Sequence, residues 1–191
     1  MSADVDLDFA DRTAILDLIK HIPAQKLHKK EPVRHTSGVY VQPIPYDPVI
    51  GASAIHYKDA DQRGYFKLDF LNVGVYQHIK SQEHYEKLLA APIPWHRLAD
   101  PEFTKQIIHI SNYHEQVSRM LPDSIPRMAM FLAAIRPAKK HLFGKPWEVM
   151  NKTIWDRVDG EYSFKKAHGI AYATLVGLHI NIVDENSRIH S

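Results

Sequence analysis

The chain has 191 residues, of which 45% are hydrophobic and 24% charged, a composition typical of one folded domain or two small lobes rather than a disordered or fibrous protein. Its net charge of +2 indicates no partner by itself. The absence of cysteine excludes disulfides, thiolate zinc sites and cysteine nucleophiles. The longest apolar run, Gly169 to Leu178, is about half of what crosses a bilayer. Because the N-terminus is also acidic, unlike a signal peptide, we expect no membrane partner and a cytoplasmic location.

Charge is unevenly distributed along the chain. The first eleven residues hold four aspartates and no base, whereas residues 20–34 hold five bases against one acid. Residues 127–168 carry nine lysines and arginines against four acids. Solvated charged faces explain many such runs. The same arrangement also suits a protein that holds metal ions beside a polyphosphate or a nucleic-acid backbone.

The first elements indicate a small sheet. The segment Asp4–Phe9 alternates aspartates with Val5, Leu7 and Phe9, which predicts a half-buried strand with carboxylates along its outer face. Asp11 is expected to cap a helix that Pro23 ends. The apolar stripe of this helix is Ile15, Leu18, Ile19 and Ile22.

The next segments predict further strands. Val39–Val41 is expected to be a strand, followed by a proline-rich loop over residues 42–51. Segments 54–57 and 65–70 are expected to form a hairpin around the turn residues 59–64.

From Val73 onward the pattern becomes helical, so the predicted class is α+β with a boundary near residue 72. The expected helices are Ser81–Ala90, one entered through Asp100 and Pro101, Ser124–Ile135, Pro146–Val158 and Phe164–Ile182.

The acidic strands suggest a metal site. In segment 65–70, Phe66, Leu68 and Phe70 are expected to point inward, with Lys67 and Asp69 on the opposite face. Two strands that present acids on one face of a sheet can bring three carboxylates together, and such a cluster favours a divalent cation. Oxygen ligands favour Mg²⁺ or Mn²⁺, and the spacing suits two ions. A plain strand with a solvated acidic face is the alternative.

Two other metal sites are excluded by spacing. An EF-hand loop beginning at Asp4 would need glycine at its sixth position and glutamate at its twelfth, where this chain has Phe9 and Ile15. The thirteen histidines include no H-E-x-x-H pair, so a zinc site is not expected.

Six segments, in order, resemble the catalytic core of the C-family DNA polymerases, the family of the bacterial DNA polymerase III α subunit. Individually each match is weak, and together they cover almost the whole chain. They are Asp4–Phe9, Arg34-His35-Thr36-Ser37-Gly38-Val39, Phe66–Leu71, Tyr113–Val117, Arg136 with Gly144–Met150, and Tyr162–Ala173.

The resemblance implies a polymerase-β-like nucleotidyltransferase palm over residues 1–72, its thumb reduced to about 10–33, and helical fingers over 73–191. By this resemblance the catalytic residues Asp4, Asp6 and Asp69 hold two Mg²⁺ or Mn²⁺ ions. One ion activates a primer 3′-hydroxyl and the other accompanies a nucleoside triphosphate.

Basic residues would neutralise phosphate charge. The resemblance assigns nucleotide and phosphate binding to Lys67, Arg136, Lys145, Lys165, Lys166, His168 and Tyr172, and DNA binding to Arg34, His35, Lys139 and Lys140. In the last helix, lysines in the first turn oppose the helix dipole and suit an anion site. A buried apolar helix with solvated lysines is the alternative.

The chain also departs from the family. It lacks the phosphoesterase domain, the clamp-binding motif, the C-terminal nucleic-acid-binding domains and the Gly-Ser element before the first aspartates, and Pro137 replaces a second motif arginine. The first hypothesis is a minimal Mg²⁺-dependent nucleotidyltransferase acting on a DNA primer or primer–template. The alternative is an inactive or split polymerase relic that binds nucleic acid or replication proteins. So reduced a core would suit a viral protein in the host cytoplasm. The sequence does not determine whether the substrate is DNA or RNA, whether a template is required, or how many copies of the chain assemble.

Overall fold

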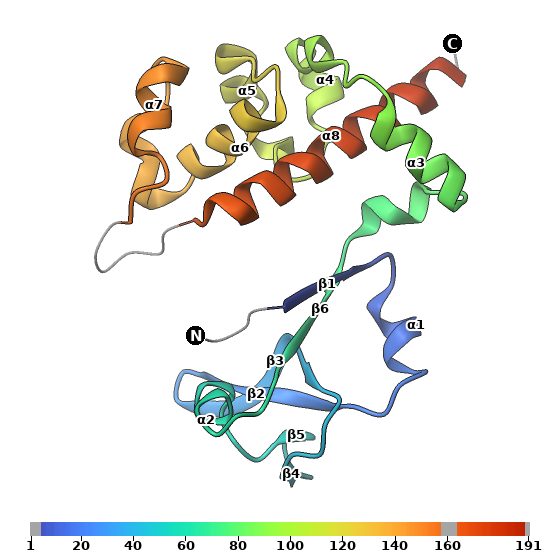
Figure 1. Cartoon of the computed structure of the whole chain (residues 1–191), viewed down its shortest axis with the longest axis vertical. Coiled ribbons are helices and arrows are strands. Elements are labelled where there is room, and N and C mark those ends of the chain that lie inside the picture. The colour runs from blue at the N-terminus through green and yellow to red at the C-terminus, as the bar shows by residue number, and fades with distance from the viewer. Residues whose placement is uncertain (1–4, 158–163, 190–191) are drawn as a thin grey trace. The chain divides into compact units, whose positions relative to one another are not determined.

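The computed structural model describes residues 5–157 and 164–189, and the chain divides into two compact units, 1–79 and 80–191. The first unit holds the strands and the second is helical, which confirms the predicted α+β class (Figure 1). Asp4 and the start of the last matched segment, Tyr162 and Ser163, lie outside the described residues.

A mixed four-stranded sheet forms the first unit, in the order β1-β6-β3-β2 (Figure 1). The strands are β1 (Val5–Phe9), β2 (Ile22–His28), β3 (Glu31–Tyr40) and β6 (Leu68–Asn72). β1 runs parallel to β6, whereas β3 is antiparallel to both β6 and β2. The alternation predicted for the first strand is confirmed, because Asp6 and Asp8 are exposed while the apolar residues between them are half-buried.

The helix predicted after the first strand is shorter than expected. Asp11 caps α1 (Arg12–Leu16) by accepting the Thr13 N–H at 2.8 Å, as predicted. The helix ends well before Pro23, however, and Leu18 is 80% exposed. Ile22 and Pro23 instead pair with Tyr40 and Val39 in the sheet. The prediction of a helix up to Pro23 is wrong because the last residues of the apolar stripe pair in the sheet.

A hairpin that the sequence analysis missed joins β2 to β3. Its turn is Lys29-Lys30, and both residues have positive φ, 50° and 72°. Two such residues are typical of a type I′ turn, which usually contains asparagine and glycine rather than lysine. The first two residues of the predicted strand Val39–Val41 are the end of the much longer β3, and Val41 lies just beyond it.

The predicted hairpin over residues 54–70 is wrong. Turn residues 59–62 belong to the helix α2 (Tyr57–Gln62), which is capped by His56, and the following strand pairs with β1 and β3. The proline-rich loop contains the strand β4 (Tyr46–Asp47), which pairs with β5 (Ala52–Ser53) directly after the loop. Phe66, expected inside, lies before the strand and is 41% exposed.

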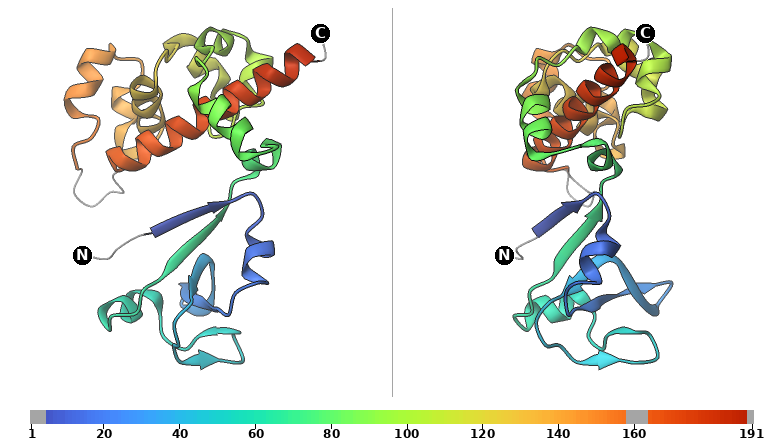
Figure 2. Two further views of the ribbon diagram at one scale, coloured as in Figure 1. Left: turned by 45° about the vertical axis from the view of Figure 1, so that its right-hand side comes forward. Right: turned by 90° about the vertical axis from the view of Figure 1, so that its right-hand side faces the viewer.

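The second unit packs short helices against one long helix (Figure 2). The predicted start of a helix at Asp100 is confirmed, because its side chain caps the helix by accepting the Glu102 N–H. Ser81 and Ser124 cap their helices in the same way, by accepting the N–H groups of His84 and Arg127. In the centre lies α6, in which residues 128–134 are all buried. The α-helices are α3 (Gln82–Ala90), α4 (Pro101–Thr104), α5 (His114–Met120), α6 (Ile125–Ala134), α7 (Trp147–Thr153) and α8 (Lys166–Ile189).

The chain also contains 3₁₀ turns between the α-helices. They are η1 (Gly74–His78) in the first unit and η2 (Trp95–Ala99), η3 (Ser111–Tyr113) and η4 (Pro137–Leu142) in the second. Across the described ranges, no helix combines the length and the apolar character that a membrane span requires.

Candidate functional site

The pairing of β1 with β6 brings two predicted metal ligands to neighbouring positions. Asp6 lies opposite Asp69 in the parallel register, and adjacent strands are about 4.8 Å apart. Residues opposite each other in neighbouring strands present their side chains on the same face. On the other face, the rings of Phe9 and Phe70 lie 4.9 Å apart. The two aspartates therefore share the face away from this aromatic contact, as the sequence predicted.

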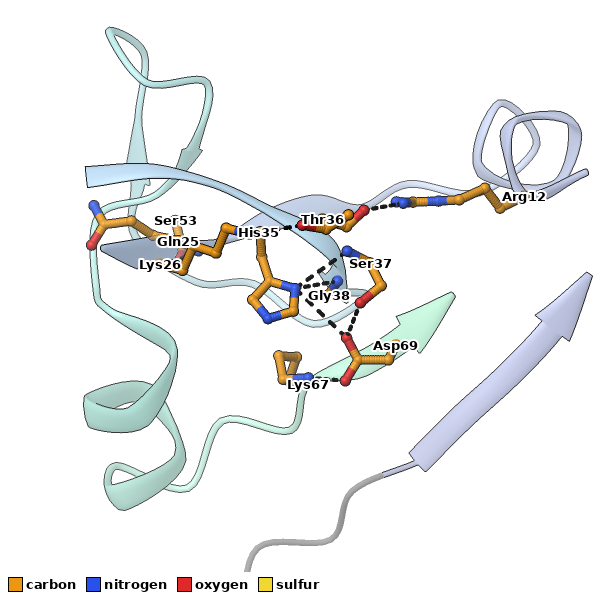
Figure 3. Close-up of polar contacts among 10 residues, drawn as sticks. All are labelled: Arg12, Gln25, Lys26, His35, Thr36, Ser37, Gly38, Ser53, Lys67 and Asp69. Atoms are coloured by element: carbon orange, nitrogen blue, oxygen red, sulfur yellow. Dashed lines mark hydrogen bonds and ion pairs between the residues drawn. The ribbon is translucent and has the colours of Figure 1, made fainter. Parts of the chain in front are cut away.

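Asp69 is nevertheless buried, with 7% of its surface exposed, where an open carboxylate was expected. Figure 3 shows its two oxygens held by different groups: Ser37 Oγ donates to Oδ1 at 2.7 Å, and the Lys67 ammonium contacts Oδ2. Burial alone would raise the pKa of Asp69, but the hydrogen bonds from Lys67 and Ser37 outweigh it and leave the pKa below its ordinary value. The carboxylate is thus charged and already neutralised by a lysine.

The cover over Asp69 is a bulge of β3. Gln25 pairs with Arg34 and Pro23 with Val39, so residues 35–38 bulge out opposite a single residue of β2. His35 Nδ1 accepts N–H groups from Gly38 at 2.8 Å and from Ser37 at 3.3 Å. The bulge is therefore held in shape by a side chain of its own.

The imidazole of His35 lies close to Asp69 without donating to it. Its Nδ1 is 3.7 Å from Asp69 Oδ1, but because Nδ1 accepts backbone N–H groups it carries no proton to share. Burial lowers the pKa of His35, and the positive charge of Lys67 lowers it further. A neutral ring with its proton on Nε2 follows from this arrangement.

Two more cations anchor the bulge from its exposed side. Lys26 Nζ donates to Thr36 Oγ1 at 2.7 Å, and an Arg12 amino group donates to the Thr36 carbonyl (Figure 3). The sequence analysis missed Arg12, Lys26 and Thr36 as parts of this site. The only signal in the sequence was the basic character of residues 20–34, which did not indicate that these cations converge on one bulge.

Asp8 extends the acidic face one step along β1. Partial burial of its carboxyl raises the pKa of Asp8, and the negative charge of Asp6 raises it further. Asp6 and Asp8 are both exposed, unlike Asp69.

The carboxylates fit a magnesium site by their chemistry, since all are oxygen ligands on one sheet face. Within residues 5–157 and 164–189, however, no three histidine, aspartate or glutamate side chains gather closely enough to hold a metal ion. The third predicted ligand, Asp4, lies outside that range. The described residues therefore supply two carboxylates in register, Asp6 and Asp69.

In the second unit, aromatic rings surround two of the predicted phosphate-binding residues. The Arg136 guanidinium lies 5.2 Å from the centre of the Phe164 ring, and Tyr172 stacks on the same ring at 5.8 Å. His109, which the sequence analysis did not single out, meets Tyr172 edge-on at 4.7 Å and adopts a φ of 65°. Burial, followed by the charge of Arg136, lowers the pKa of His109. These residues form one cluster within the second unit.

The remaining predicted cations differ in exposure. Lys145, Lys165 and Lys166 are exposed, with Lys166 opening α8, and His168 is half-buried in its first turn. Arg34 is exposed in the first unit, where its Nε donates to the Ile50 carbonyl at 3.2 Å.

Lys139 does not fit the predicted role in DNA binding. It is 5% exposed, and its ammonium donates to the Thr153 carbonyl at 2.7 Å. Lys140 beside it is exposed and lines a cavity of about 250 Å³. The other residues of that wall are Tyr113, Gln116, Ala134, Ile135 and Phe143.

Comparison with known protein families, with curated proteins and with solved structures finds no match for this chain.

Proposed function

We propose that this protein is a Mg²⁺-dependent nucleotidyltransferase that adds nucleotides to the 3′-hydroxyl of a primer. The observation that supports the proposal most is the parallel pairing of β1 and β6, which sets Asp6 opposite Asp69 on one face of the sheet. Two segments separated by about 60 residues in the sequence thus meet at their acidic positions. This is the arrangement that the resemblance to C-family polymerases requires of a palm domain.

The proposal gives each group of residues a task. Asp6 and Asp69, with Asp4, would hold Mg²⁺, and the ion, when bound, neutralises triphosphate charge and makes a hydroxyl more acidic. The exposed cations of the second unit would bind phosphate oxygens: Arg136, Lys145, Lys165 and Lys166. Residues 1–72 would then be the palm and 73–191 the fingers, and the partners would be a nucleoside triphosphate and a DNA primer in the cytoplasm.

Primer extension with labelled nucleotides tests this function. Asp6→Asn and Asp69→Asn should each lower Mg²⁺-dependent incorporation by about a hundredfold or more, because each removes a charge that faces the ions. Asp8→Asn is the matched control, since Asp8 lies on the same strand and face without belonging to the predicted ligands. Wild-type activity in both Asp6→Asn and Asp69→Asn would refute the proposal. DNA and RNA primers, with and without template, identify the substrate in the same assay.

A second candidate is a non-catalytic or split relic that binds nucleic acid or a replication protein. Burial of Asp69 and its use by Lys67 and Ser37 favour it, because a structural aspartate needs no metal. This candidate predicts DNA binding that weakens with salt and persists in Asp69→Asn, with no incorporation in any condition. A split enzyme would instead gain activity when a partner chain is added.

A further inference from the structure

The Lys67 ammonium lies on Asp69 Oδ2, where a metal ligand would need an open oxygen (Figure 3). A buried carboxylate requires a counter-charge, and in this structure Lys67 provides it. Because Ser37 holds the other oxygen at 2.7 Å, a cation that binds Asp69 must compete with one of these two donors. The competition is with the lysine, since two positive charges at one oxygen repel each other.

The path of the Lys67 side chain is set by Gly38. A Cβ added at Gly38 would lie 2.8 Å from Lys67 Cδ, so the lysine stem passes directly over this glycine. Gly38 is also the β3 partner of Asp69. The Lys67 Nζ is 6.0 Å from the centre of the Tyr57 ring, which leaves the ammonium held by Asp69 rather than by close stacking. The stem therefore packs over Gly38, and the ammonium is held at its end by Asp69.

We propose that Lys67 is an exchangeable counter-ion: it neutralises Asp69 in the metal-free protein and is displaced when a divalent cation binds between Asp6 and Asp69. This inference rests on the proposed function. A lysine suits the role because its ammonium is a compact charge on a flexible chain. Once displaced, the ammonium loses its carboxylate partner, and a phosphate oxygen of the substrate can replace that partner. Metal binding would thereby prepare the phosphate site.

The first test uses the wild-type chain and needs no variant. Lysine acetylation, read at each residue by mass spectrometry, should be slow at Lys67 without Mg²⁺ and several-fold faster with it, because a paired and half-buried amine reacts poorly. Lys58, exposed in α2, is the internal reference and should react equally in both conditions. If the chain binds Mn²⁺ and the acetylation rate of Lys67 does not change when the cation is added, the exchange is overturned.

The second test measures Mn²⁺ binding by electron paramagnetic resonance. Lys67→Met should bind Mn²⁺ about tenfold more tightly than wild type, because the competing charge is gone. Lys58→Met removes the same charge from an exposed site and should leave the affinity unchanged. Adding Asp69→Asn to Lys67→Met should abolish the gain. If Lys67→Met binds Mn²⁺ no more tightly than the wild type, the exchange is overturned. If this variant fails to fold, the acetylation of the wild-type chain decides instead.

The outcomes separate this inference from the proposed function. If the wild type and Lys67→Met both bind no Mn²⁺, the metal site is refuted and the exchange is refuted with it. If Mn²⁺ binds in an Asp6-dependent way while Lys67 neither gains reactivity nor limits affinity, only the exchange is wrong. The proposed nucleotidyltransferase would then stand on its own assay.

Discussion

Lys139 and Lys140 are adjacent lysines that the structure places in different environments, and they allow a sharp test of the fold. Lys139 is 5% exposed and donates to the Thr153 carbonyl, at the last residue of α7, whereas Lys140 is exposed. We predict that Lys139→Met destabilises the second unit and leaves nucleic-acid binding unchanged. Lys140→Met should leave stability unchanged.

The magnitude follows from the contact. A hydrogen bond from a charged donor contributes about 1.5–3 kcal/mol, and a cation at a helix C-terminus adds about 0.3–1 kcal/mol. Removing the desolvated charge of Lys139 offsets part of this, and methionine retains most of the buried stem. We therefore expect a net loss of about 1–3 kcal/mol. In a unit that spans residues 80–191, each kcal/mol lowers the melting temperature by about 4 °C.

Urea unfolding, followed by circular dichroism of the full chain, measures the loss, and fluorescence anisotropy with a labelled oligonucleotide measures binding. The helical unit dominates the circular dichroism signal, so its transition is the one observed. Equal stability of Lys139→Met and wild type would refute the buried contact. A weaker affinity for DNA in Lys139→Met, with stability unchanged, would instead restore the role that the sequence predicted for Lys139.

Three further predictions concern the pH dependence of stability, the left-handed glycines and the hairpin turn. The hydrogen bond from His84 lowers the pKa of Glu185. The stability that this carboxylate contributes is therefore present above about pH 4.5 and is lost as the pH falls through its lowered pKa. Glu185→Gln should make the urea midpoint depend less on pH across this range. Gly51→Ala should destabilise the first unit slightly more than Gly64→Ala. Both glycines have positive φ, which costs an alanine about 1–2 kcal/mol, but only a Cβ at Gly51 would displace a side chain, the Arg34 guanidinium, whose Nε donates to the Ile50 carbonyl. Equal urea midpoints would contradict the difference. Replacing Lys29-Lys30 by Asn-Gly should raise the stability of the first unit by about 1–2 kcal/mol, because both positions have positive φ, and an unchanged thermal midpoint would argue against this turn.

Local signals in the sequence were sufficient where short-range chemistry decides the structure. The alternation of β1 and the caps at Asp11 and Asp100 are confirmed. Each depends on side chains within a few residues of one another, through the periodicity of a strand or the hydrogen bond of a cap. The division into an early sheet and later helices follows from the same periodicities.

The same local signals failed where distant partners compete. The stripe from Ile15 to Ile22 has helical spacing, but Ile22 pairs with Tyr40 in the sheet and packs, half-buried, against the core of the first unit. Residues 59–64 carry turn signals, yet 59–62 complete the helix α2, and the strand that follows pairs with β1 and β3 instead of folding back as a hairpin. The turn at Lys29-Lys30 contains no residue that favours positive φ, so only the pairing of β2 with β3 determines it.

For the candidate site, the sequence alone determined which residue types face the same side of each acidic strand, because side chains alternate by a fixed period of two. Only the tertiary structure decided that Asp69 is enclosed. The register of β1 against β6 sets Asp6 opposite it, and the bulge at residues 35–38 covers it and brings Ser37 to its carboxylate. Burial and charge pairing depend on what the rest of the chain brings near, and no spacing within a strand encodes that.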